Sequence, residues 1–147
     1  MTVFLVHDGD GKILQANKLF DAPTKQYVDQ MEANEHSYIA LNRETLVQPD
    51  AFYVHNKRLR RMQVMAARVS KKIIKAGGTD TVVITGAPAE CEYRVDVNIP
   101  GVGTVTTHAG ILSDGEIEMG MDVPCLFTIH LTKFPLKPFA VQIEASA

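Results

Sequence analysis

Few side chains in the 147-residue sequence have types and spacings that are typical of catalysis. The five histidines are scattered, at His7, His36, His55, His108 and His130. None belongs to a His-Glu-x-x-His pair, and no serine lies in a nucleophile elbow. Glu116 and Glu118 lie about 7 Å apart on one face of an expected strand, which would suit paired carboxylates, but a solvated strand face explains them more simply. The sequence therefore predicts no enzyme and no cofactor.

Two groups of residues resemble metal sites only in part. Asp8-Gly9-Asp10-Gly11-Lys12 places aspartates at alternate positions, but the rest of a calcium loop and its closing glutamate are missing. Cys91 and Cys125 have no CxxC partner and no neighbouring histidine cluster, so they make a poor zinc site. We expect a tight turn at the aspartates. We also expect two separate buried thiols, because a reducing cytosol disfavours a disulfide.

The densest group of charges lies between residues 57 and 75. It contains no acid and eight cations: Lys57, Arg58, Arg60, Arg61, Arg68, Lys71, Lys72 and Lys75. Residues 1–56 carry four cations against eight acids, and residues 76–147 carry three against nine. We expect the basic stretch to contact acidic surfaces of neighbouring subunits, with a solvated face as the simpler alternative. Phosphate contacts to nucleic acid are less favoured, because no aromatic residue lies between Tyr53 and Tyr93 to stack on bases.

The elements that would position these groups are clearest in the C-terminal half. Between Glu92 and Ile99 apolar and polar residues alternate, which is typical of a strand with one buried face. Similar strands are predicted at residues 81–85, 103–107, 116–121, 125–131 and 139–145. Glycine, proline and Asp-Gly turns separate them. Many short strands at this spacing predict an antiparallel β-sandwich.

The N-terminal third predicts a small α+β element. Residues 2–7 and 13–16 form an expected hairpin, and residues 22–33 an expected helix with Pro23 in its first turn. Strands follow at 37–41 and 51–55, and the chain turns at Asn56-Lys57 into residues 58–62. The predicted order is ββαββ.

Three regions are thus expected along a mainly β chain. They are an N-terminal domain at 1–61, a basic connector or first sandwich strand at 62–76, and the β-sandwich at 77–147. A helix is the alternative for residues 62–75, because apolar residues there also recur at helical spacing. The first residues lack the basic start of a secretory signal, and no apolar run approaches the ~18 residues of a membrane span. We expect a soluble chain made in the cytosol, without membrane insertion.

Several short motifs occur together in a recognisable order. They are the Asp10–Leu14 hairpin, the Tyr53-Val54 strand with its turn to Leu59–Met62, the Gly78–Pro88 strand with its Gly-Ala-Pro turn, and the segments Gly115–Met119, Val123–Ile129 and Phe139–Ala145. This order resembles that of small virion proteins of tailed bacteriophages, found among tail and tail-associated components. The resemblance implies a C-terminal immunoglobulin-like module and no catalytic residue.

The expected function is therefore structural. We expect a non-enzymatic bacteriophage virion protein, tail- or head–tail-associated, made in the host cytoplasm and present in several copies. Its expected partners are other virion proteins, namely tail, connector or capsid subunits, with the host surface as a further candidate. It would act in particle assembly or as a decoration or attachment module. The alternatives are a nucleic-acid-binding module using residues 57–75 and a carbohydrate-binding β-sandwich. The latter gains little support, because the chain has no tryptophan.

Overall fold

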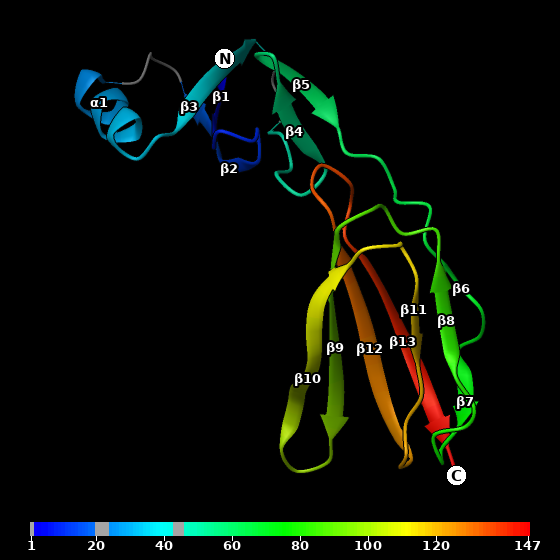
Figure 1. The fold of residues 1–147 in the computed structure, drawn as a ribbon. Helices are drawn as coiled ribbons and strands as arrows, with labels where there is room; N and C mark the ends of the chain where they lie inside the picture. The colour runs from blue at the N-terminus through cyan, green and yellow to red at the C-terminus, as the bar shows by residue number, and fades with distance from the viewer. Residues whose placement is uncertain (1, 20–23, 43–45) are drawn as a thin grey trace. The chain divides into compact units, whose positions relative to one another are not determined.

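The computed structural model describes residues 2–19, 24–42 and 46–147, and it is mainly β (Figure 1). The chain divides into two compact units, Met1–Gln63 and Val64–Ala147. Each unit has hydrophobic clusters of its own. The prediction of a mainly β fold with antiparallel sheets is confirmed.

The N-terminal unit is organised around β1 (Thr2–His7), the central strand of a three-stranded antiparallel sheet. Its neighbours are β2 (Ile13–Leu19) and β3 (Ser37–Asn42). Four successive residues of β1, Val3 to Val6, are buried, because apolar groups cover both of its faces. Val3 and Leu5 pack with Val54 and its neighbours on one face, and Phe4 and Val6 pack with the helix on the other.

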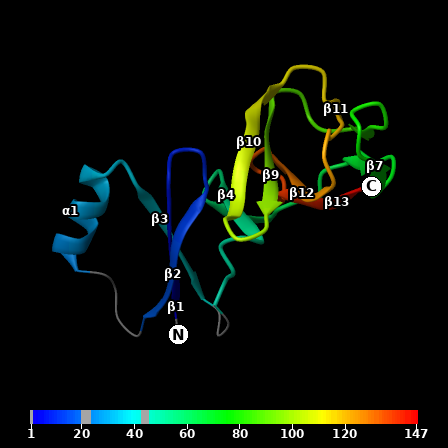
Figure 2. The same ribbon diagram turned by 90° about the horizontal axis from the view of Figure 1, so that it is seen from below.

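That helix is α1 (Lys25–Ala33), which lies beside the sheet (Figure 2). Thr24 caps its first turn, with Oγ1 accepting the Tyr27 backbone N–H at 3.3 Å. Met31 is its buried residue and packs on Phe4 and Val6. The predicted helix is confirmed from Lys25 onward, whereas Ala22 and Pro23 lie outside the described residues.

A two-stranded hairpin completes the N-terminal unit. It consists of β4 (Phe52–His55) and β5 (Arg58–Arg61), joined by Asn56 and Lys57, whose φ angles are 50° and 61°. Two successive positive φ values define the turn that matches the natural twist of paired strands. The order β1-β2-α1-β3-β4-β5 has one strand more than the predicted ββαββ. The additional strand is β5, which follows the turn predicted at Asn56-Lys57 and pairs with β4.

The C-terminal unit contains two sheets that share one hydrophobic core. The larger sheet has the order β10-β9-β12-β13-β7, and the smaller has the order β11-β8-β6. The strands are β6 (Arg68–Val69), β7 (Ile73–Lys75), β8 (Val82–Thr85), β9 (Cys91–Ile99), β10 (Gly103–Leu112), β11 (Ile117–Met119), β12 (Cys125–Thr132) and β13 (Phe139–Ser146). The arrangement is sandwich-like, since Val95 and Phe127 of the larger sheet share the core with Val82 and Ile84 of the smaller.

One detail differs from the predicted antiparallel arrangement. β7 runs parallel to β13, with Ile74 opposite Ala145, so the larger sheet is mixed at this edge. Both figures show the C-terminus close to β7. Residues 62–75, for which a connecting strand is expected and a helix is the alternative, contain the strands β6 and β7. Burial explains the choice of strand, because Ile74 is buried in the core while its neighbour Ile73 is exposed.

Candidate functional site

The eight predicted interaction residues fall into two groups that belong to different units. Lys57, Arg58, Arg60 and Arg61 lie on the β4–β5 hairpin, and Arg68, Lys71, Lys72 and Lys75 lie on or between β6 and β7. All eight side chains are exposed. The basic stretch is continuous in sequence but is not one structural element.

On the hairpin, strand pairing gathers cations on one face. Tyr53 lies opposite Arg60, and His55 lies opposite Arg58. On its other side, Tyr53 pairs with Lys12 in an isolated antiparallel β-bridge. Directly paired residues of antiparallel strands point to the same face. These five residues therefore form one surface, which we call the ribbon face. Arg61 belongs to the opposite face, where its guanidinium lies 5.6 Å from the centre of the Phe52 ring.

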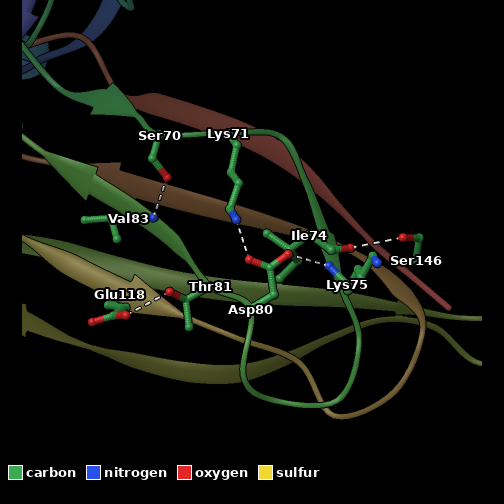
Figure 3. Close-up of polar contacts among 9 residues, drawn as sticks. All are labelled: Ser70, Lys71, Ile74, Lys75, Asp80, Thr81, Val83, Glu118 and Ser146. Atoms are coloured by element: carbon green, nitrogen blue, oxygen red, sulfur yellow. Dashed lines mark hydrogen bonds and ion pairs between the residues drawn. The ribbon is translucent and has the colours of Figure 1, made fainter.

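In the C-terminal unit, Lys71 is the one of the four cations that forms an ion pair within the described chain, with Asp80 (Figure 3). Lys71 donates to the Asp80 carboxylate, which also accepts the Lys75 backbone N–H at 2.8 Å. The hydrogen bond from Lys71 and then that from Lys75 hold the pKa of Asp80 below its usual range. Asp80 thereby closes the turn between β7 and β8.

Figure 3 also shows the polar contacts that join this turn to its neighbours. Ser70 Oγ accepts the Val83 backbone N–H at 2.9 Å, and Ser146 Oγ donates to the Ile74 carbonyl at 3.2 Å. Glu118 accepts a hydrogen bond from Thr81 at 2.8 Å. Glu118 is thus a cross-strand partner of Thr81, and its contact supports a structural role.

The outer face of the larger sheet carries a polar network that the sequence did not reveal. At its centre the Asp96 carboxylate accepts hydrogen bonds from Thr106 at 2.7 Å and Arg94 at 2.9 Å, and lies 3.2 Å from His130 Nε2. The Thr106 hydrogen bond, followed by Arg94, lowers the pKa of Asp96. Sequence alternation placed Arg94 and Asp96 on one face, but finding Thr106 and His130 required the register of three strands.

This network has only part of a catalytic arrangement. An Asp–His pair can orient a general base, but the base must also reach a nucleophile. Thr106 donates its hydroxyl hydrogen to Asp96 itself, and no hydroxyl or thiol in the described chain is hydrogen-bonded to His130. The contacts join β10, β9 and β12 and therefore support a structural role.

β10 is unusual among the edge strands of the C-terminal unit. It has ten residues, nine of them exposed, and it carries no lysine, arginine or acid. The other edges are short and charged: β7 has three residues with Lys75, β11 has three with Glu118, and β6 has two with Arg68. Short length and charge are the usual protection of a sheet edge against pairing. A single bulge, between Thr106 and His108, interrupts β10.

An apolar pocket of about 490 Å³ lies near the β9–β10 turn. Its lining residues come from the end of β9 and the start of β12: Val97, Asn98, Ile99, Pro100, Val123, Pro124, Cys125 and Leu126. Burial raises the pKa of the Cys125 thiol and also that of Cys91. Both cysteines are free. They begin adjacent antiparallel strands and so lie toward opposite ends of the sheet.

No group of three or more histidine, cysteine, aspartate or glutamate side chains is placed to hold a metal ion within residues 2–19, 24–42 and 46–147. Over the same ranges, no helix has the length and apolar character needed to span a membrane.

Comparison of the chain with protein-family models, with curated proteins and with solved structures gives no match.

Proposed function

We propose that the protein is a non-enzymatic structural protein of a tailed-bacteriophage virion, tail- or head–tail-associated, and that its immunoglobulin-like C-terminal unit joins subunits through β10. The order of sequence motifs supports the virion assignment. Two sheets around one core, with β9 paired to the non-consecutive β12, support the immunoglobulin-like description. The observation that carries the assembly role is the long, uncharged and exposed edge of β10.

The proposed occupant of this edge is β10 of a second copy. A two-fold contact brings the same surface of both subunits together, so a charge near the axis would face its own copy. Like charges on directly paired strands are destabilising. β10 avoids this repulsion because none of its ten residues is a lysine, an arginine or an acid. The larger sheets of two copies would then form one continuous sheet.

The bulge defines how the copies pair. It divides β10 into Gly103–Thr106 and His108–Leu112, so each half offers its own short ladder of backbone groups. Ile111 belongs to the second half, lies on the outer face of the sheet and is 66% exposed. Contact with a second copy would cover this apolar side chain, which adds a hydrophobic contribution to the backbone hydrogen bonds.

Two matched substitutions test this contact. Ile111→Lys introduces a charge on β10, and Ile73→Lys introduces the same charge on β7, at the opposite edge of the same sheet, where Ile73 is 62% exposed. Sedimentation velocity should show a dimer for the unmodified chain and for Ile73→Lys, and a monomer for Ile111→Lys. A monomeric unmodified chain at every concentration, or equal dissociation by both variants, would refute self-pairing through β10.

The virion assignment needs a separate measurement. Phage particles from a producing culture should be labelled by an antibody against the recombinant chain, with gold label confined to one part of the particle in electron micrographs. Disrupted particles provide the control for a covered epitope. If intact and disrupted particles both lack label while the lysate contains the protein, the virion assignment is wrong.

A further inference from the structure

The β4–β5 hairpin concentrates positive charge without a compensating acid. Residues 51–79 contain no aspartate or glutamate, and residues 57–61 contribute four cations. Lys12 adds a fifth, because its bridge to Tyr53 places it at the side of the hairpin. No ion pair is formed by Lys12, Lys57, Arg58, Arg60 or Arg61 within the described chain. All five side chains are exposed, so an anionic partner can reach them.

The ribbon face repeats its cations at a regular spacing. Arg58 and Arg60 are two residues apart on one strand, so their positions differ by about 6.7 Å. This is about twice the 3.4 Å axial rise between successive phosphates of one DNA strand. A two-stranded β-ribbon also has a width that the major groove of DNA admits. Arginine adds a planar fork of donors that matches the oxygens of a phosphate.

The ribbon face also contains an aromatic residue, Tyr53, whereas the basic stretch of residues 57–75 has none. Tyr53 lies between Lys12 and Arg60 across three paired segments, although Arg60 is seven residues away in sequence. An aromatic ring beside cations offers a base a surface on which to stack. An acidic protein surface would use the cations but has no need of this ring, so the combination favours nucleic acid over an acidic subunit.

The hairpin is held in a defined position within the N-terminal unit. The Val54 backbone N–H donates to the Gly11 carbonyl at 2.8 Å, and Val54 is buried against the β1–β2–β3 sheet. Phe52 and Leu59 pack against the same cluster. A fixed ribbon loses little conformational freedom when a ligand binds.

We propose that the ribbon face, together with Lys57 in the turn, binds the sugar–phosphate backbone of nucleic acid without sequence preference. The binding groups are Lys12, Lys57, Arg58 and Arg60, and Tyr53 supplies the stacking surface. Arg61, on the opposite face, takes no part. This surface is independent of β10 and belongs to the other unit.

The test uses the full chain and two fluorescently labelled probes, a mixed-sequence DNA duplex and one of its separated strands. Binding is followed by fluorescence anisotropy over a series of salt concentrations. Four phosphate contacts predict a slope of log affinity against log salt of about −3.6 for the duplex and about −2.8 for the single strand. A steep slope of this kind separates phosphate contacts from hydrophobic association.

Two double variants, each of which removes two positive charges from a different unit, locate the binding site. Arg58→Gln/Arg60→Gln should weaken binding at least about tenfold at low salt and reduce the magnitude of the duplex slope by about 1.8. Arg68→Gln/Lys72→Gln removes the same charge from the C-terminal unit and should leave the affinity within about twofold. Tyr53→Leu should weaken single-strand binding more than duplex binding, because stacking requires an unpaired base. Far-UV circular dichroism checks that each variant is folded.

Three results would overturn the proposal. The first is the absence of binding to both probes at the lowest salt concentration. The second is an equal loss of affinity in the two double variants, which would mean that net charge alone is responsible. The third is competition by polyglutamate as effective as competition by unlabelled DNA, which would assign the ribbon face to acidic protein surfaces. None of these results depends on whether β10 forms a dimer.

Discussion

Gly11 lies directly against Val54, and this contact joins the β1–β2 turn to the β4–β5 hairpin. The Val54 N–H donates to the Gly11 carbonyl at 2.8 Å, while Gly11 has a φ of +92°. A Cβ atom added to Gly11 would lie 1.9 Å from the Val54 carbonyl oxygen. No side chain fits there unless the hairpin moves.

Gly11→Ala is therefore expected to destabilise the N-terminal unit by about 3 kcal/mol, because backbone strain and a clash with main chain coincide. Urea unfolding followed by far-UV circular dichroism measures this loss. Gly9→Ala is the matched control in the same turn, with no atom within 4 Å of the added Cβ, and should change stability by less than about 0.5 kcal/mol. Equal effects of the two substitutions would contradict the contact.

The register of β12 predicts that alanine substitutions at two adjacent residues cause very different losses of stability. Phe127 is 1% exposed and faces the core, whereas Leu126 is 41% exposed on the outer face. Phe127→Ala should cost about 3–5 kcal/mol through lost burial and the cavity left behind. Leu126→Ala should cost less than about 1 kcal/mol, as surface substitutions usually do. Chemical unfolding that gave the reverse order would mean that β12 is shifted by one residue.

The Asp96 network predicts acid sensitivity. Since the folded state lowers the pKa of Asp96 from its ordinary value of 3.8, ionised Asp96 stabilises the fold above that value. This stabilisation is lost as the pH falls through the lower folded-state pKa. Asp96→Asn should lower the unfolding temperature at neutral pH, and the gap to the unmodified chain should narrow below about pH 4. Calorimetry across this range provides the measurement.

Glu144→Gln is the control for that series, because Glu144 makes no ion pair or side-chain hydrogen bond within the described chain. Its unfolding temperature should follow that of the unmodified chain at each pH. If Asp96→Asn also followed the unmodified chain throughout, the network would not contribute to stability.

The hydrogen bond from the Lys75 backbone to Asp80 predicts that removing Asp80 changes hydrogen exchange only near this turn. Asp80→Ala removes the acceptor of the Lys75 backbone N–H and the partner of Lys71, so amide hydrogen exchange at Lys75 should become several-fold faster. The Val83 amide, held by Ser70, should be much less affected. Glu116→Gln is the matched control, because its side chain makes no hydrogen bond in the described chain. Unchanged exchange at Lys75 would show that Asp80 does not close the turn.

The strands of the C-terminal unit could be predicted where one face is buried, because apolar and polar residues then alternate in the sequence. β9 and β12 alternate because one face packs on the core, and both were located to within a residue or two. β10 was predicted only as far as Thr107 but continues to Leu112. Its side chains are almost all exposed, so the sequence there carries no apolar alternation.

Pairing between distant segments could not be predicted in the same way. Ile73–Lys75 pairs with Glu144–Ser146, about seventy residues later, and no local pattern encodes that parallel register. The ribbon face depended on the same kind of information, since Lys12 is remote from Tyr53 in sequence. The eight cations of residues 57–75 were found from sequence, whereas the contribution of Lys12 and the division of the cations between two faces and two units came from strand pairing.

The position of β13 affects the order in which the protein can fold during synthesis. β13 lies between β12 and β7, so β7 has no partner in the larger sheet until Phe139–Ser146 has left the ribosome. The Met1–Gln63 unit and the β9–β10 hairpin use only segments made earlier. Until β13 is made, we therefore expect the nascent chain to combine a folded first unit with an incomplete larger sheet, whose exposed apolar surface is of the kind that chaperones bind.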